Sequence, residues 1–449
     1  MAGRVVMLAV DGLDWVLLRS LVAAGRLGPL ASMLRAGAWG DLDVGSAVWG
    51  LDAKGAEALV SPLLWTTAAS GTYYFSHGIF DFRDFMRSPQ RPPLFSGSDV
   101  RQARIWDILS SRGQESLVVG YMVTHPAVPI RGVIVSDLFG ETSDPAVVHP
   151  RELADPLARA AGAPDYAALV RGGLAAMPMD EMELSSPAPP VESDEDRQRV
   201  ESVLHEFLGD RPDLVQRYLH PDASPEDARY RSLLFHRLVY PCLRDARFHR
   251  VFLELLRMRP QFAFAVCYYR LVDSVSHGFW TEGAAVSDEF RRNYGQVLPR
   301  ACDRIAAQVA EVQALLTPED VLIVLSDHGF TAAPPPDGAA LADDLEYRPV
   351  GEHRAPGVFM ARGESVRPGR VENISILDVC PTICDYLGLP QAEAFDGGVV
   401  PGLLHAEAPR KLPLVDSYAR VSGSADEALS QDEQRRLIKH LAALGYLEE

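Results

Sequence analysis

Residues 321–330 read VLIVLSDHGF. Five apolar residues and a serine lead directly into an adjacent carboxylate and imidazole, Asp327 and His328. A short, continuous apolar run is typical of a strand that is buried on both faces of a parallel sheet. The same design recurs in VVMLAV, which ends at Asp11, and in QFAFAVCYYRLVD, which ends at Asp273. Because such strands alternate with amphipathic helices, we predict an α/β fold with three layers, α/β/α, around a mostly parallel central sheet.

The expected elements fall into two regions of the chain. Residues 1–140 and 261–449 carry the predicted strands and are expected to form one discontinuous domain. Residues 141–260 are richer in proline and charge and show helical periodicity, which predicts a mainly helical insertion that acts as a cap or lid. We expect strands near 4–10, 39–44, 116–123, 261–273, 320–327 and 357–363, and helices near 14–37, 101–113, 151–172, 195–219, 225–258, 286–316, 374–389 and 432–449.

The bulk composition excludes some classes of protein. The 449 residues are 47% hydrophobic, which is enough for a sizeable core, and the 43 basic and 61 acidic residues give a net charge of −18. Such a surface repels the phosphate backbone of a nucleic acid, so we expect no polymer of that kind as a partner. An acidic enzyme can still bind a small anionic substrate if metal ions supply local positive charge.

The cysteine content and the N-terminal residues indicate the cellular compartment. The number of cysteines is odd and no CxxC occurs, which indicates neither a disulfide framework nor a zinc ribbon. The N-terminal apolar run VVMLAV has no cleavage-site pattern after it, and no apolar run approaches the roughly 20 residues of a membrane span. The sequence therefore predicts a cytoplasmic protein with reduced thiols and no membrane contact; it does not predict the oligomeric state.

Residues able to bind metal follow the predicted strands. His277 stands four residues after Asp273, and His353 precedes another short strand in GEHRAPGVFMARG. Taken singly, an aspartate after a strand is usually a cap or turn residue, and a histidine is usually structural. In open α/β sheets, however, ligands bind beyond the carboxyl ends of the strands. Three aspartates and three histidines converging there would repel one another without cations, so the pattern predicts two divalent metal ions. The mixed Asp/His set suits zinc, with manganese or iron as alternatives.

The candidate nucleophiles lie in SPLLWTTAASG, residues 61–71. Ser61 fits best, because Ser-Pro is typical of a helix N-cap followed by proline at the first helical position, and a helix N-terminus adds partial positive charge. The hydroxyl is expected to serve as the cap, as the nucleophile or as both, since the two roles are compatible. Thr66 is the fallback.

Six signposts in this order resemble the alkaline phosphatase superfamily, and most closely its type I phosphodiesterase/nucleotide pyrophosphatase branch. They cover about 4–140 and 261–405 and read AVDGLDW, SPLLWTTAASG…HGIFDF, DSVSH, LSDHGF, GEH…GVFMARG and ILDVCPTICDYLGLP. The resemblance implies that one metal takes Asp11, Ser61, Asp327 and His328. It implies that the other metal takes Asp273, His277 and His353, and that Ser61 is the catalytic nucleophile.

The chain departs from that branch at two points. Its nucleotide pyrophosphatases usually have threonine as the nucleophile, where this chain has Ser61. They also place an asparagine after the HGI element, and here that position is Phe82. The group that stabilises the transferring phosphoryl oxygen must therefore come from elsewhere, from a backbone N–H at 62–64 or from a residue of the insertion. The sulfatase pattern C/S-x-P-x-R is absent at Ser61.

The expected function is hydrolysis of a phosphoric ester in a small phosphorylated substrate. Ser61 attacks phosphorus, a phosphoseryl intermediate forms, and water releases it. Phosphodiester or pyrophosphate cleavage is the first choice by resemblance. A phosphomonoesterase, a phosphonate hydrolase or a phosphomutase of the same superfamily is the alternative. A protein that binds metal and phosphoester without turnover is the alternative from another class.

Overall fold

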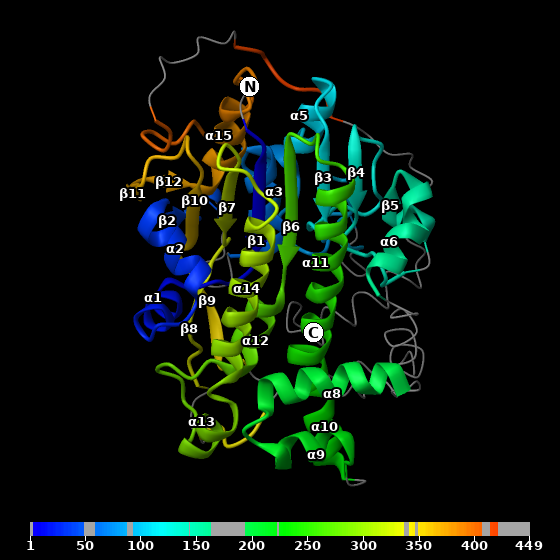
Figure 1. The fold of residues 1–449 in the computed structure, drawn as a ribbon, viewed down its shortest axis with the longest axis vertical. Helices are drawn as coiled ribbons and strands as arrows, with labels where there is room; N and C mark the ends of the chain where they lie inside the picture. The colour runs from blue at the N-terminus through cyan, green and yellow to red at the C-terminus, as the bar shows by residue number, and fades with distance from the viewer. Residues whose placement is uncertain are drawn as a thin grey trace.

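The computed structural model describes residues 3–48, 59–87, 93–142, 144–162, 194–221, 224–335, 341–345, 349–405 and 414–420. Within them a ten-stranded sheet has the strand order β11-β2-β10-β7-β1-β6-β3-β4-β5, with β12 also paired to β2, and a separate two-stranded ribbon joins β8 to β9. The sheet lies between two layers of helices (Figure 1). The predicted three-layer α/β/α fold with a mostly parallel sheet is confirmed.

The elements have the following bounds. The strands are β1 (Val5–Val10), β2 (Ala38–Asp43), β3 (Ser116–Val119), β4 (Gly132–Val135), β5 (Val148–His149), β6 (Phe264–Tyr269), β7 (Val321–Leu325), β8 (Gly329–Ala332), β9 (Gly351–Arg354), β10 (Gly357–Arg362), β11 (Gly369–Arg370) and β12 (Ile374–Ser375). The α-helices are α1 (Trp15–Ala23), α2 (Gly28–Ala36), α3 (Ser61–Ser70), α4 (Tyr74–His77), α5 (Ile105–Ser111), α6 (Ala154–Ala160), α8 (Asp194–Leu208), α9 (Pro212–Leu219), α10 (Pro225–Leu234), α11 (Tyr240–Met258), α12 (Leu271–Phe279), α13 (Asp288–Tyr294), α14 (Val297–Gln313) and α15 (Val379–Tyr386). A π-helical segment, η5 (Phe235–Val239), joins α10 to α11. Short 3₁₀ turns lie at Ser46–Val48, Pro145–Val147, Arg151–Leu153 and Ile376–Asp378.

The three strands that carry the predicted ligands are neighbours at the centre of the sheet. β1 pairs in parallel with β6, Val10 opposite Tyr269, and with β7, Ala9 opposite Leu325. Every residue of these strands is buried, because helices cover both faces. Their carboxyl ends therefore meet at one edge, which puts the residues after each strand in one place.

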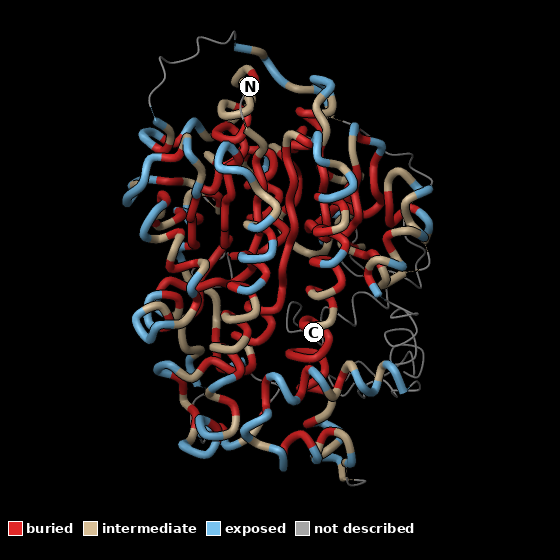
Figure 2. Tube along the Cα trace, viewed as in Figure 1, coloured by how far each residue is buried: buried red, intermediate tan, exposed pale blue. Residues whose placement is uncertain are grey.

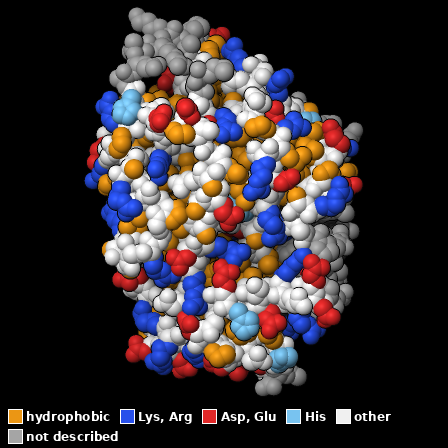
Figure 3. Space-filling view, in the orientation of Figure 1, with side chains coloured by type: hydrophobic (Ala, Val, Ile, Leu, Met, Phe, Trp, Pro, Cys, Tyr) orange, Lys and Arg blue, Asp and Glu red, His pale blue; other side chains and the backbone are white. Residues whose placement is uncertain are grey.

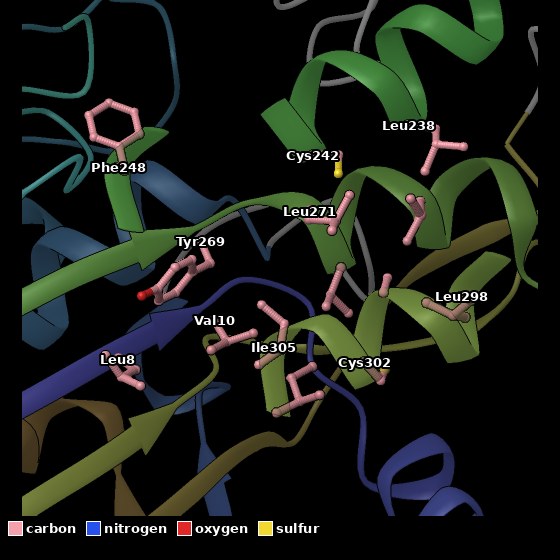
Figure 4. Close-up of a cluster of buried hydrophobic side chains, with 14 of the residues drawn as sticks. Leu8, Val10, Leu238, Cys242, Phe248, Tyr269, Leu271, Leu298, Cys302 and Ile305 are labelled. Carbon is pink, nitrogen blue, oxygen red and sulfur yellow. The ribbon is translucent and has the colours of Figure 1, made fainter. Parts of the chain in front are cut away.

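Side chains on the two faces of the sheet form two separate cores, because successive residues of a strand point to opposite faces. Leu8, Val10 and Tyr269 belong to the core shared with α11, α12 and α14, whereas Met7, Ala9 and Tyr268 belong to the core shared with α3, α5 and α15. Figure 4 shows the first core, in which the strand side chains face Leu271 and Ile305. Figure 2 shows the sheet as a continuous buried layer between partly exposed helices.

Three of the expected helices are each two helices in the structure. The helix expected over 286–316 is α13 and α14, and α13 ends at the cap residue Gly295. The helix predicted over 14–37 is two helices, α1 and α2, because the chain turns at Gly25, which has a positive φ of 79°, and restarts ahead of Pro29. The segment 195–219 likewise divides into α8 and α9 before Pro212. The strand at 357–363 exists as β10 but runs antiparallel to both of its neighbours.

The predicted insertion 141–260 contains α6 and α8 to α11 among the described residues. α8, α9 and α10 lie below the sheet in Figure 1, whereas α11 packs on β3 and β6 and so forms part of the helix layer of the sheet. The predicted helix over 432–449 lies outside the described residues.

The surface carries both signs of charge. Acidic and basic side chains are interspersed over the face shown in Figure 3. In the described part of the chain, no single helix has the length and hydropathy of a membrane span; α1 and α2 do so only together, with a bend of 102° between them. All five cysteines are buried free thiols.

Candidate metal and active site

All seven side chains predicted from the sequence lie together at the carboxyl edge of the sheet. Asp11 follows β1, and Asp327 and His328 follow β7. Asp273 and His277 are one turn apart on α12, Ser61 is the first residue of α3, and His353 is on β9.

The first group is formed by Asp11, Asp327, His328 and Ser61. The Nε2 atom of His328 lies 3.3 Å from Asp11 Oδ1, 3.5 Å from Asp327 Oδ2 and 3.4 Å from Ser61 Oγ. One ligand atom from each of Asp11, Asp327 and His328 lies within 4.8 Å of the others, and all three residues are fully buried. Ligand atoms this close together could hold one metal ion.

The second group is formed by Asp273, His277 and His353. Asp273 Oδ1 lies 3.3 Å from Nε2 of His353 and 3.6 Å from Nε2 of His277, and the two imidazole nitrogens are 3.0 Å apart. His328 lies 3.9 Å from the same Asp273 oxygen and stacks on the ring of His353, so it stands between the two groups.

Carbonyl oxygens orient the three imidazoles. The Nδ1 atom donates to Leu59 O at 2.9 Å in His353, to Gly351 O at 3.2 Å in His277, and to Gly329 O at 3.3 Å in His328. Because a carbonyl can only accept, each Nδ1 carries a proton, and each Nε2 faces the carboxylates. This is the arrangement by which a second set of contacts prepares histidine for a metal.

The carboxylates are crowded. Burial, and then the charge of Asp273, raise the pKa of Asp11 to about 7. Burial, and then the charge of Asp11, raise the pKa of Asp327 well above its usual value. Burial opposes ionisation of Asp273 too, but the imidazoles of His277 and His353 hold the pKa of this carboxyl well below its usual value. The three carboxylates cannot all be ionised at low cost unless cations stand among them.

The donor set fits divalent cations. Both side-chain oxygens of Asp327 and Oδ1 of Asp11 are buried and accept no hydrogen bond within the described residues. A buried carboxylate oxygen in this state is costly in a protein interior unless an ion binds it. Together with the Nε2 atoms of the histidines, these oxygens are of the ligand types that zinc and manganese take.

Ser61 is buried at the start of α3 and does not cap the helix. α3 begins at Ser61, its N-cap residue is Val60, and no side chain caps it. The expectation that Ser61 caps the helix was therefore wrong by one residue, and its hydroxyl is turned toward His328. The hydroxyl of Thr66 donates to Pro62 O, and the hydroxyl of Thr67 forms a hydrogen bond with Nε2 of His77. Both threonines therefore have structural roles.

Four residues that support the site were not predicted. Trp65 and Tyr268 both donate to Oδ2 of Asp11. Asp14, in the same AVDGLDW stretch as Asp11, accepts from the N–H of Phe330 at 3.2 Å and from Nη2 of Arg354 at 2.6 Å. Asp14 thus ties the start of α1 to the β8–β9 ribbon that carries His353. The only sequence signal for this tie was the position of Asp14 before an apolar helix.

The carboxylates and imidazoles at this edge of the sheet form two groups that could each hold a metal ion, next to a serine at a helix N-terminus. The family model described as type I phosphodiesterase/nucleotide pyrophosphatase matches residues 5–364. The chain belongs to this family and, through it, to the alkaline phosphatase superfamily. It is therefore an enzyme of the class that hydrolyses phosphate esters.

Solved structures agree with this fold. Wild-type alkaline phosphatase PafA has a TM-score of 0.51 at 11% identity, covering 90% of this chain and 99% of that one. Human ectonucleotide pyrophosphatase/phosphodiesterase 5 has 0.48 at 13%, covering 90% and 100%. Phosphonate monoester hydrolase from Silicibacter pomeroyi has 0.43 at 15%, covering 92% and 78%. The similarity to PafA supports the fold. No curated protein sequence matches the chain.

Proposed function

We propose that the protein is a phosphodiesterase or pyrophosphatase with two divalent cations and Ser61 as the nucleophile. The observation that supports this most is the position of the Ser61 hydroxyl, 3.4 Å from Nε2 of His328 and buried at the edge where both ligand groups meet. Family membership and the Asp/His donor set support the same reaction.

The residues divide the work as follows. Asp11, Asp327 and His328 would hold one cation beside Ser61, and Asp273, His277 and His353 would hold the other. When bound, the cations lower the pKa of the serine hydroxyl and offset charge on the phosphoryl group. Ser61 Oγ attacks phosphorus, the bond to the leaving group breaks, and a phosphoserine forms. Water then attacks the same phosphorus and releases Ser61. Zinc is our first choice of metal and manganese our second.

The N-terminus of α3 has a second role. The aligned peptide dipoles of this helix place partial positive charge where the phosphoryl group would bind. The backbone donors expected at 62–64 are mostly unavailable, since Pro62 has no N–H and Leu64 donates to Val60 O at 3.1 Å. The N–H of Leu63 and residues of the insertion remain the candidates for this role.

A comparison of Ser61→Ala with the wild type tests this proposal. Both proteins are loaded with zinc or manganese and assayed on p-nitrophenyl phosphate, bis(p-nitrophenyl) phosphate and a p-nitrophenyl phosphonate. We expect the diester to be the best substrate and the variant to lose at least about 10³-fold in rate at unchanged metal content. A phosphoryl adduct on the Ser61 peptide after rapid acid quenching would support the covalent step. Equal rates in the two proteins would remove Ser61 from the mechanism.

A further inference from the structure

The ring of Phe330 packs against all three imidazoles of the two ligand groups. Phe330 is on β8, two residues after His328, and its side chain is fully buried. Its ring centre is 5.0 Å from that of His277, 5.2 Å from that of His353 and 5.6 Å from that of His328. One phenyl ring, with no catalytic role in the proposed reaction, therefore contacts a histidine of each group.

The imidazoles meet this ring at steep angles. The planes of His277 and His353 are inclined by 82° and 83° to the phenyl plane, and that of His328 by 60°. Perpendicular contacts are favourable between aromatic rings, because the positive edge of one ring meets the negative face of the other. Such contacts depend on the angle between the rings, so the phenyl ring resists rotation of the imidazoles.

Hydrogen bonds alone fix two of the imidazoles weakly. Nδ1 of His277 donates to Gly351 O at 3.2 Å, and Nδ1 of His328 donates to Gly329 O at 3.3 Å. Both distances exceed the usual value of about 2.9–3.0 Å. An imidazole held by one long hydrogen bond can still turn about its side-chain bonds, so packing must supply the rest of the constraint on its orientation.

Phe330 is itself held in place. Its N–H donates to Asp14 at 3.2 Å, and it pairs with His353 across the β8–β9 ribbon. Two glycines lie against the ring: a Cβ atom added to Gly12 would be 2.8 Å from Cε2 of Phe330, and one added to Gly351 would be 3.2 Å from Cδ1. The ring is therefore fixed through its backbone and enclosed along both of its edges.

The second ligand group depends on this packing more than the first. The side chains of His277 and His353 are 12% and 14% exposed, whereas that of His328 is fully buried. His328 is further confined by Ser61, 3.4 Å away, and by the stacked ring of His353. Loss of the phenyl ring should therefore release the two histidines of the second group more than His328.

We propose that Phe330 is a positioning residue for the pair of cations: its ring holds the three imidazoles at the angles at which their Nε2 atoms face the carboxylates. The proposal rests on the proposed function for the presence of the cations, and it adds a residue that has no metal-binding atom of its own. Removal of a group that orients a metal ligand typically lowers metal affinity by about 10- to 100-fold.

The zinc affinity of Phe330→Leu, compared with that of the wild type, tests the proposal. Leucine keeps the position apolar but has no aromatic ring. Titration of metal-free protein against a fluorescent zinc chelator measures the two dissociation constants. We expect Phe330→Leu to bind one ion about 10- to 100-fold more weakly and the other less than about 10-fold more weakly. In a His277→Gln background, which should keep only the first ion, the same change should cost less than about 10-fold.

Phe290→Leu is the matched control, because Phe290 is 1% exposed and packs on the ring of Tyr294 on α13, with ring centres 4.9 Å apart. Both variants lose the same atoms from a buried site, so both should lower the melting temperature of the metal-free protein. Only Phe330→Leu should weaken zinc binding. Wild-type zinc affinities in Phe330→Leu, or the same loss in both variants, would overturn the proposal.

Trp280→Phe replaces Phe330→Leu if the latter does not fold. The indole of Trp280 stacks on the phenyl ring with ring centres 5.9 Å apart, so a smaller ring there loosens Phe330 without removing it. We expect the affinity for one zinc ion to fall by about 2- to 10-fold. Affinities equal to those of the wild type would then overturn the proposal.

A measurement on the metal-free protein separates this proposal from the proposed function. With ¹³C at Cε1 of histidine, the signals of His277, His328 and His353 are assigned by replacing each residue in turn with glutamine. If the wild type binds no zinc, the proposed function fails, and these signals still test Phe330. We expect the signals of His277 and His353 to broaden in Phe330→Leu, as their rings gain freedom to rotate, and to stay sharp in Phe290→Leu. Sharp signals in both variants would overturn the role of Phe330.

Discussion

Replacing Asp14 by alanine should destabilise the protein more than any single contact of this residue would suggest. The Asp14 carboxylate is 1% exposed and accepts hydrogen bonds from five donors. Oδ1 caps α1 by accepting from Val16 N at 2.8 Å and Leu17 N at 3.1 Å, and loss of a cap costs about 1 kcal/mol. Oδ2 accepts from the buried Phe330 N–H, and leaving that donor unpaired costs about 1–3 kcal/mol. The pair with Arg354, whose side chain is 35% exposed, adds at most about 1 kcal/mol.

Together these contributions predict that Asp14→Ala lowers the free energy of unfolding by about 3 kcal/mol. Arg354→Gln removes only the last contribution and should cost less than about 1 kcal/mol. Urea denaturation of both variants, compared at equal m-value, measures the difference. A cost for Asp14→Ala no larger than that of Arg354→Gln would refute the idea that Asp14 ties α1 to the ribbon that carries His353.

Three other changes test different parts of the account. Five hydrogen bonds, three of them from Arg4, hold the pKa of Asp320 at about 2 against the opposing effect of burial. Because its pKa is lower in the folded protein than the unfolded value of 3.8, ionised Asp320 stabilises the folded state above that pH. We expect the wild type to be about 1–2 kcal/mol more stable than Asp320→Asn at any pH above 5. In acid-denaturation curves this difference should disappear as the pH falls toward 2. Tyr268→Phe removes a donor to Asp11 and should lower diester kcat/KM about 10-fold with little change in melting temperature; an unchanged rate would exclude that role. Chelation should lower the melting temperature of the wild type, because Asp11 and its neighbours are then crowded without cations, and a calorimeter would show no shift if the site binds no metal.

The sequence predicted the parts of the structure that local pattern controls. VLIVL is a buried strand followed by Asp327 and His328, because an unbroken apolar run in an α/β protein favours a strand covered on both faces. Asp11 and Asp273 follow neighbouring strands for the same reason. The direction of β10 could not be predicted, because antiparallel and parallel strands have the same apolar pattern when both faces are covered.

The supporting residues that the sequence did not predict make contacts between distant parts of the chain. The link from Asp14 to Arg354 spans 340 positions, and nothing near either residue indicates it. The break between α1 and α2 could have been predicted from the sequence, because Gly25 and Pro29 both favour a turn there.

The central claim is that six side chains from four separate parts of the chain hold two cations beside Ser61. Metal content per chain, measured by mass spectrometry after gel filtration of the wild type, Asp327→Asn and His277→Gln, tests it most directly. We expect about two ions in the wild type and a loss of about one in each variant, with the folded state checked by circular dichroism. Wild-type protein that stays folded and active with less than one ion per chain would contradict the account.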